Sequence, residues 1–276
     1  MRGEVPFYLF IILVIVWWNL DEEGTPELRT PRQGAEQQAA PEGTPLPGPS
    51  FSDPKMYIED KGRVQDGTGT GFAVDRHGLW MTARHVVAGC SEVGFVQPGQ
   101  RWLKPARDVW VHPNSDMALI SGPSTKSAFE LVGAPPTAGE TAFHIGFPQG
   151  RPGDVVTTTV GRARMITTGR HRSDEPVIAY VEKRRFPNFS GSLGGLSGGP
   201  IFNASGQVVG VTVAENRRRG RVIGTAPRSW VRLFQTAGKQ PQVSGHLYPQ
   251  PDPKRLHKAG KRLRANFTVA QLICRA

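Results

Sequence analysis

The feature that most restricts the fold of this chain is a series of short apolar runs separated by Gly, Asn and Pro turns. Each run has the length and the Val, Ile, Thr and Phe content of a β-strand. The runs cover residues 69–74, 79–83, 117–120, 142–147, 155–160, 177–182, 200–202, 207–213 and 221–226. Since no helical pattern separates these runs, they predict an all-β barrel or sandwich. In residues 227–235, a proline in the first turn and apolar residues at helical spacing predict one short helix after the strands.

The segment before this β region has the composition of a membrane segment followed by a linker. Residues 5–18 are an uncharged apolar run, and as a helix its 14 residues reach about 21 Å, short of the roughly 30 Å hydrocarbon core of a bilayer. We interpret residues 1–20 as an uncleaved membrane anchor, with a cleaved signal peptide as the alternative. Arg2 places the rest of the chain outside the cytoplasm. Residues 21–54, rich in Pro, Gly, Glu and Gln, are predicted to be a disordered linker.

The net charge of +11 is concentrated in the folded region and the C-terminal tail. We expect one folded domain over residues 55–236, followed by a basic tail over residues 237–276 that carries eight Lys or Arg and one acidic residue. Such a surface could attract anionic lipid, nucleic acid or an acidic protein, but a solvated basic surface explains the charge equally well. The charge therefore does not predict nucleic acid as a partner, and the oligomeric state stays open.

Two cysteines, Cys90 and Cys274, leave two possibilities open. They are too few for a disulfide scaffold and have no metal-ligand spacing, so we expect no metal site. If the domain is exported, the two thiols could pair and anchor the tail, where Phe267, Ala270 and Ile273 recur at helical spacing and suggest a short docking face. Two free thiols are the alternative.

Three segments carry residues of catalytic type. The sequence GGLSGGP at 194–200 places Ser197 between glycine pairs, which permit an exposed hydroxyl and backbone N–H groups turned toward a reacting carbonyl oxygen. His85 follows the apolar run LWMTA, and Asp116 precedes the run MALI. Taken alone, His85 and Asp116 are more simply structural residues, and a Gly/Ser-rich turn is the alternative for the segment around Ser197. The interpretation therefore depends on the three segments together and on their order.

Together, GTGFAV, TARHVV, SDMALI, GLSGGP and QVVGV, in this order, resemble the chymotrypsin/trypsin-like serine peptidases. The short bacterial Deg/HtrA branch, here without a PDZ domain, is the most similar. The resemblance implies a two-barrel fold, a His85, Asp116 and Ser197 triad, and an oxyanion hole formed by the N–H groups of Gly195 and Ser197. It also implies a cofactor-free endopeptidase that cleaves proteins or peptides outside the cytoplasm, as in a bacterial periplasm.

Two departures from the family pattern concern the loop before the nucleophile and the specificity pocket. Leu196 occupies the position where digestive relatives have Asp and the Deg/HtrA branch has Asn, which leaves a catalytically silent binding module with a basic surface as the alternative function. Gly191 lies where trypsin-like enzymes place their specificity residue, and it favours small or medium apolar substrate side chains. The other expected pocket walls are Thr212, Val213, Ala214 and Gly224.

Overall fold

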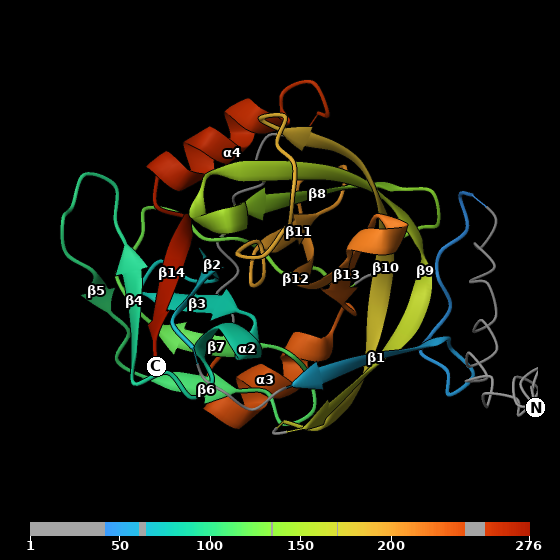
Figure 1. The fold of residues 1–276 in the computed structure, drawn as a ribbon, viewed down its shortest axis with the longest axis horizontal. Helices are drawn as coiled ribbons and strands as arrows, with labels where there is room; N and C mark the ends of the chain where they lie inside the picture. The colour runs from blue at the N-terminus through green and yellow to red at the C-terminus, as the bar shows by residue number, and fades with distance from the viewer. Residues whose placement is uncertain (1–41, 61–64, 134, 170, 241–251) are drawn as a thin grey trace, which may run out of the picture. The chain divides into compact units, whose positions relative to one another are not determined.

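The computed structural model describes residues 42–60, 65–133, 135–169, 171–240 and 252–276. These residues form two seven-stranded sheets with few helices (Figure 1). The membrane segment predicted for residues 1–20 lies outside these ranges, and within them no helix is long and apolar enough to cross a bilayer. The expectation of a mostly β fold is confirmed.

The first sheet has the strand order β5-β4-β14-β2-β3-β7-β6. Its core contains the fully buried Trp80 and Phe95 rings, whose centroids are 4.9 Å apart. The ring of Phe267, which precedes the last strand, packs against Trp80 at 5.0 Å. The strands are β2 (Gly67–Ala73), β3 (Leu79–Thr82), β4 (Glu92–Val96), β5 (Lys104–Pro105), β6 (Val109–Val111), β7 (Ala118–Ser121) and β14 (Val269–Arg275).

The second sheet closes into a barrel. Its strand order is β1-β9-β10-β13-β12-β11-β8, and β8 also pairs with β9, so the six strands from β8 to β13 form a ring. The strands are β1 (Lys55–Asp60), β8 (Thr141–Gly146), β9 (Gly153–Gly169), β10 (Ser173–Phe186), β11 (Pro200–Phe202), β12 (Val208–Asn216) and β13 (Arg221–Thr225). The predicted runs lie within or across these strands, but β9 and β10 are much longer than the sequence pattern indicated.

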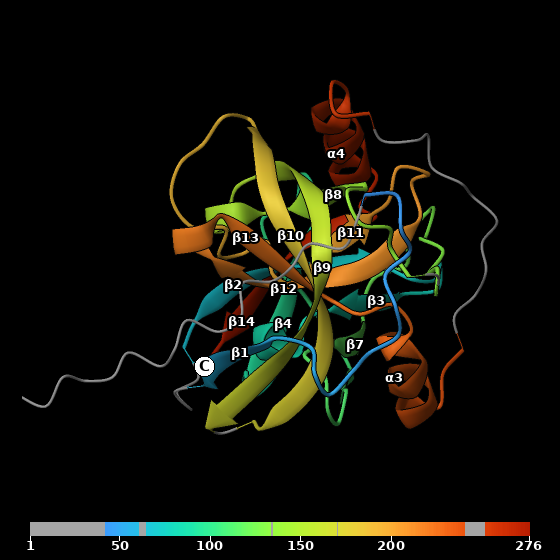
Figure 2. The ribbon, with the colours of Figure 1, turned by 90° about the vertical axis from the view of Figure 1, so that its right-hand side faces the viewer.

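Two strands share one edge of β9, which explains its length. β8 pairs antiparallel with Gly153 to Thr158, and β1 pairs parallel with the far end, from Arg164 to Gly169. The opposite edge of β9 pairs with β10 along most of its length. β9 and β10 form one long hairpin that extends past the barrel, with β1 beside its end (Figure 2).

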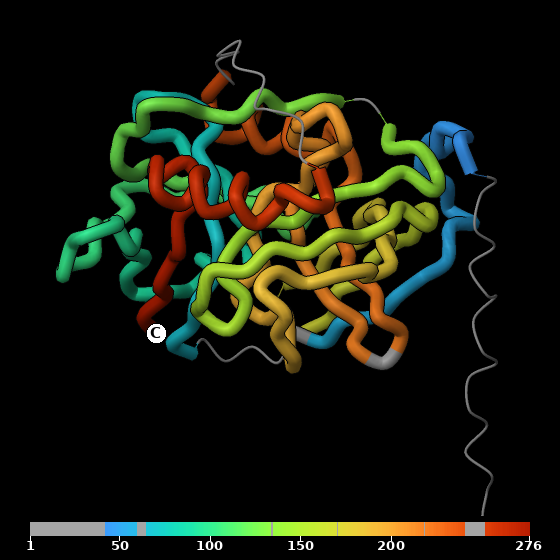
Figure 3. The backbone as a smooth tube through the Cα atoms, turned by 90° about the horizontal axis from the view of Figure 1, so that it is seen from above, coloured from blue at the N-terminus to red at the C-terminus, as the bar shows by residue number. Residues whose placement is uncertain are grey.

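The segment predicted as a basic tail packs on the second sheet and contributes a strand to the first. Helix α4 (Leu256–Ala265) packs on β8 and β9, and β14 then lies between β2 and β4 in the first sheet (Figure 3). The helical docking face suggested by Phe267, Ala270 and Ile273 is therefore wrong. Residues 269–275 form a strand, since β2 and β4 hydrogen-bond to both of its edges and its β-branched residues suit that environment.

The segments at the two ends of the predicted domain give one difference from the sequence expectations and one agreement. Residues 42–54, predicted to be disordered, pack on the second barrel: Leu46 is 3% exposed and its N–H donates to the Pro136 carbonyl oxygen. A single buried leucine among Pro and Gly is too weak a signal to detect in the sequence. The helix expected in residues 227–235 is present as α3 (Ser229–Ala237) and buries Trp230 and Phe234. The remaining short helices are α2 (Arg84–Val87), η1 (Pro148–Gly150) and η2 (Arg217–Arg219).

Candidate active site

His85 and Asp116 meet between the end of one strand and the start of another. β3 ends at Thr82 and α2 begins at Arg84, so His85 lies in the first turn after the strand, while Asp116 immediately precedes the segment leading into β7. Asp116 Oδ2 lies 2.6 Å from His85 Nδ1, and Oδ1 accepts the His85 backbone N–H at 2.9 Å. Both carboxylate oxygens therefore fix the position of the same residue.

The electrostatics of this pair favour an ionised Asp116. Burial acts to raise the pKa of its carboxyl, but the charge of His85 and its two hydrogen bonds, with a contribution from Arg84, outweigh burial and hold the pKa below its usual value. The side chain of His85 is about half exposed, at 48%. The acid is thus buried and the imidazole faces the cleft.

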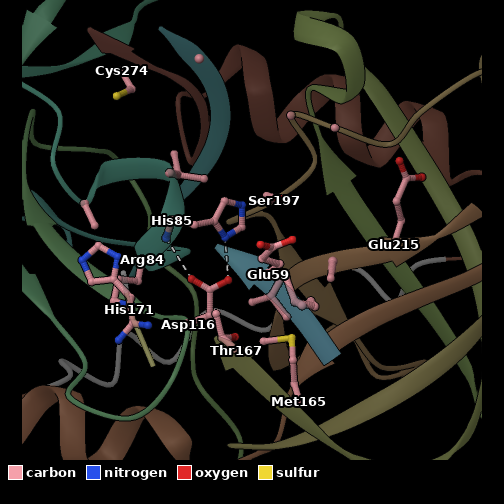
Figure 4. A pocket seen from close by; sticks show the side chains of 18 of the residues that line it. Glu59, Arg84, His85, Asp116, Met165, Thr167, His171, Ser197, Glu215 and Cys274 are labelled. Carbon is pink, nitrogen blue, oxygen red and sulfur yellow. Dashed lines mark hydrogen bonds and ion pairs between the residues drawn. The ribbon is translucent and has the colours of Figure 1, made fainter. Parts of the chain in front are cut away.

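Ser197 lies in the same cleft as the other two predicted triad residues. The cleft has a volume of about 760 Å³ and is lined by His85, Asp116 and Ser197 among others. Figure 4 shows Ser197 beside the imidazole of His85, with Asp116 bound to the ring's other nitrogen. Thr70 holds the loop by donating its N–H to the Ser197 carbonyl oxygen at 2.8 Å. Gly198 has a φ of +87° and approaches Thr70 so closely that a Cβ would overlap its carbonyl oxygen, so this position requires glycine.

The loop before Ser197 is held in place by hydrogen bonds from two other segments. The Gly194 carbonyl oxygen accepts the Gln149 N–H, and the Gly195 carbonyl oxygen accepts the Thr70 hydroxyl at 2.7 Å. In a planar trans peptide the C=O and the following N–H point in opposite directions. Because the Gly194 carbonyl points to Gln149, the N–H of Gly195 points the other way. Gly195 adopts a φ of +95°, which a residue with a side chain rarely takes.

Leu196 acts as a core residue in this loop. Its side chain is fully buried, its N–H donates to the Leu193 carbonyl oxygen at 2.8 Å, and it packs so near Gly146 that a Cβ there would lie 3.0 Å from it. Apolar packing by Leu196 therefore helps to hold the loop that leads to Ser197.

Two of the five predicted pocket residues line the cleft. Val213 and Ala214 form part of its wall, together with Glu215, which the sequence analysis did not select. The Glu215 carboxylate accepts the Leu193 N–H at 2.9 Å and the Ser192 hydroxyl. It therefore connects the cleft wall in β12 to the loop that leads to Ser197.

The other three predicted pocket residues lie elsewhere. Gly191 borders a neighbouring polar pocket of about 220 Å³, where its carbonyl oxygen accepts a hydrogen bond from Arg185 at 2.8 Å. Thr212 is buried, and its hydroxyl lies 2.9 Å from Nδ1 of the buried His144. Gly224 faces core side chains that a Cβ would overlap. Contrary to expectation, Thr212 and Gly224 are cross-strand partners that face the interior of the second barrel, and a register shift between Thr212 and Ala214 separates Thr212 from the residues of β12 that line the cleft.

Two buried histidines outside the triad are held neutral. Burial lowers the pKa of His144 to about 3, and burial together with Arg232 and Arg84 lowers that of His112 to about 4. Within the described ranges, no group of three or more His, Cys, Asp or Glu side chains is arranged to hold a metal ion.

The sequence analysis missed two sets of residues around the cleft. Tyr57, Ile58 and Glu59 of β1 line it from a strand outside the predicted runs, although the alternation in KMYIED was a readable signal. Glu175 of β10 accepts hydrogen bonds from the Asp116 segment across the junction of the two sheets. No local pattern marks Glu175, because its partners lie about sixty residues away in the sequence.

The two cysteines form a disulfide near His85. Cys90 follows α2, Cys274 lies in β14, and their Cα atoms are 5.5 Å apart. Cys274 also lines the cleft. The bridge therefore joins the end of the chain to the segment that carries His85.

Several curated proteins are similar to part of this chain. An uncharacterised protein of Sinorhizobium fredii, y4bJ, is 29% identical over 181 residues, which is 65% of this chain and 26% of that protein. A probable periplasmic serine endoprotease, DegP-like, of Hahella chejuensis is 29% identical over 178 residues, which is 64% of this chain and 35% of the relative. The chain thus spans about a third or less of the length of these relatives.

Solved structures and a family model agree with the fold. The active form of the Rv3671c protease of Mycobacterium tuberculosis matches with a TM-score of 0.52 and 22% sequence identity, over 64% of this chain and 76% of that chain. The inactive form matches with a TM-score of 0.51 and 20% sequence identity, over 63% of this chain and 88% of that chain. At these identities the likeness shows the fold alone. The model of the trypsin-like peptidase domain matches residues 69–211, just over half of the chain. With the fold and the cleft residues above, this match shows that the chain belongs to the trypsin-like peptidase family.

Proposed function

We propose that this protein is a serine endopeptidase whose triad is His85, Asp116 and Ser197. The observation that carries the proposal is the position of His85: Asp116 holds one imidazole nitrogen at 2.6 Å, and Ser197 lies beside the ring in the same cleft (Figure 4). An imidazole between a buried carboxylate and an exposed hydroxyl is the arrangement required for general-base activation of a nucleophile.

In this mechanism His85 takes the proton of the Ser197 hydroxyl while the oxygen attacks the scissile carbonyl carbon. Asp116 keeps the imidazole in the tautomer that presents an unprotonated nitrogen to Ser197, and it stabilises the imidazolium that forms. His85 then donates the proton to the leaving amine, and water hydrolyses the acyl-enzyme by the same steps in reverse order.

The N–H groups of Gly195 and Ser197 form the proposed oxyanion hole. The hydrogen bond from Gln149 to the Gly194 carbonyl oxygen supports this assignment, since it turns the N–H of Gly195 away from Gln149, and Gly195 lines the cleft. Each such donor is worth about 3 kcal/mol of transition-state stabilisation in comparable sites. This loop geometry favours an enzyme over a silent binding module.

The substrate we propose is an extended polypeptide. The ladder between β11 and β12 ends at Val211, and the cleft is lined by the next part of β12, from Val213 to Glu215. A substrate strand can add to such an edge through main-chain hydrogen bonds. With Val213 and Ala214 as walls, small or medium apolar side chains fit beside the nucleophile.

We further propose that the enzyme acts outside the cytoplasm. The Cys90–Cys274 disulfide is typical of an oxidising compartment. The printed names of the DegP-like relatives are periplasmic, and the apolar run at residues 5–18 suits a membrane anchor.

Labelling with a fluorophosphonate probe tests the nucleophile. The full chain is expected to label at Ser197 and to cleave casein, and Ser197→Ala is expected to abolish both while leaving the thermal midpoint nearly unchanged. Ser205→Ala, in an exposed turn after β11, is the matched control and keeps full activity. Casein cleavage by Ser197→Ala at the wild-type rate would refute the triad.

A further inference from the structure

Glu175 is a buried carboxylate that connects the second barrel to the catalytic aspartate. It lies in β10, is 1% exposed, and its register partner in β9 is Met165. Its Oε1 accepts the Asp116 backbone N–H at 2.8 Å, and its Oε2 accepts the Ser115 hydroxyl. Both donors come from the segment before β7, in the first sheet.

These contacts complete the hydrogen bonding of Asp116. The side-chain oxygens of Asp116 bind His85, and the backbone N–H of Asp116 binds Glu175. A buried N–H left without a partner is unfavourable, so loss of Glu175 would favour a displaced backbone at Asp116. A small displacement is sufficient to matter, since a misplacement of about 1 Å can cost a hundredfold in rate.

The charged groups around Glu175 show why this position is specialised. Burial, followed by the charge of Asp116, raises the pKa of Glu175 to about 8, while the hydrogen bonds from Ser115 and Asp116 and the charge of Arg84 oppose the rise. Arg84 is itself 7% exposed and donates to the His112 carbonyl oxygen at 3.4 Å. A buried polar side chain is unfavourable unless it is hydrogen-bonded, and Ser115 and Asp116 are the hydrogen-bond partners of Glu175.

We propose that Glu175 is a positioning residue for catalysis: by binding the Asp116 main chain, it holds that carboxylate in register with His85. The inference rests on the proposed function of the triad. It makes the geometry of the triad depend on the β9–β10 hairpin of the second barrel, although Asp116 and His85 both lie on segments that connect strands of the first sheet.

Three substitutions separate this role from simple support of the fold. Glu175→Ala removes both acceptors. Glu175→Gln retains an oxygen for the Asp116 N–H and offers an amide N–H to the Ser115 oxygen, so it is expected to rescue the geometry. Glu175→Asp withdraws the carboxylate by one methylene and serves as the milder variant if the alanine variant does not fold. The matched control is Asp174→Ala, since Asp174 is the exposed neighbour on β10 and pairs with Arg164 instead.

The experiment measures kcat and KM for a peptide substrate with the full chain, together with the low-field proton resonance of His85 Nδ1. We expect Glu175→Ala to lower kcat about a hundredfold with KM changed less than twofold, and to broaden or remove the resonance. Glu175→Asp should lose about tenfold in kcat. Glu175→Gln and Asp174→Ala should stay within about fivefold of wild type and keep the resonance.

Two results would overturn the inference. The first is a folded Glu175→Ala or Glu175→Asp variant with wild-type kcat, and the second is a Glu175→Gln variant as slow as Glu175→Ala. Ser197→Ala, measured in parallel, separates the inference from the proposed function. If wild type and Ser197→Ala are equally inactive, the triad fails as a whole, whereas an active wild type, an inactive Ser197→Ala and an unaffected Glu175→Ala overturn only the role of Glu175.

Discussion

The ion pair between Arg264 and Asp154 should be one of the most costly interactions to break in this protein. Asp154 in β9 is fully buried, and Arg264 of α4 binds its two oxygens at 2.6 and 3.1 Å. The same guanidinium donates to the Gly146 carbonyl oxygen at 3.2 Å. Gly260 brings α4 close to the carboxylate, since a Cβ there would overlap it.

Arg264→Met removes the charge and keeps an aliphatic side chain. Removing one partner of a buried pair leaves the other charge uncompensated, at a cost of about 3–5 kcal/mol in unfolding free energy. His257, at 3.5 Å from Asp154 and half exposed, offers only weak compensation. Burial raises the pKa of Asp154, and Arg264 opposes that rise. In the variant the folded-state pKa therefore rises further above the unfolded value, so the destabilisation is small in acid and grows as pH rises to neutral.

Urea denaturation of the full chain at pH 4 and pH 7, followed by tryptophan fluorescence, measures the effect. Arg262→Met is the matched control, because Arg262 is exposed on the same helix. Asp154→Leu combined with Arg264→Met removes both charges and should recover most of the stability lost in the single variant. A loss below about 1 kcal/mol at pH 7 for Arg264→Met, or a loss that shrinks between pH 4 and pH 7, would refute this reasoning.

Three further predictions concern the triad, the disulfide and a buried histidine. Asp116→Asn is expected to lower kcat by about ten-thousandfold in a peptide assay, because it presents an amide to His85. The equivalent change in trypsin causes a loss of this size. A loss below about tenfold would assign the orienting role to another acid. Cys90→Ala combined with Cys274→Ala should lower the unfolding free energy by up to about 5 kcal/mol, given a separation of 184 residues, as measured in urea; an unchanged midpoint contradicts it. Because burial lowers the pKa of His144 to about 3, its contribution to stability is complete above the unfolded pKa near 6.5 and is lost as pH falls toward 3. Between pH 6.5 and pH 5 the loss of unfolding free energy due to His144 is about 2 kcal/mol. The variant His144→Gln should lack this part of the pH dependence when denaturation is measured at both pH values.

The sequence was most informative where a local pattern and its chemistry coincide. Strands such as β3, β7 and β8 follow from short apolar runs, and α3 follows from its proline and helical spacing. His85, Asp116 and Ser197 were identified from three segments and their order, and the structure brings all three to one cleft. The family match over residues 69–211 covers the same segments.

Three features of this protein could be seen only in the tertiary structure, because they depend on contacts between distant segments. Residues 269–275 have a helical spacing of apolar residues, but β2 and β4 bind both of their edges and make them a strand. The pairing of Cys90 with Cys274 follows from that placement, because the strand brings Cys274 beside the segment after α2. The hydrogen bond that Glu175 accepts from the Asp116 backbone N–H likewise depends on how the β9–β10 hairpin packs against the first sheet. The sequence by itself shows the residue types and the local spacing of apolar residues. Long-range packing determines which strand pairs with each edge and which group pairs with each buried charge, and a local pattern cannot specify this packing.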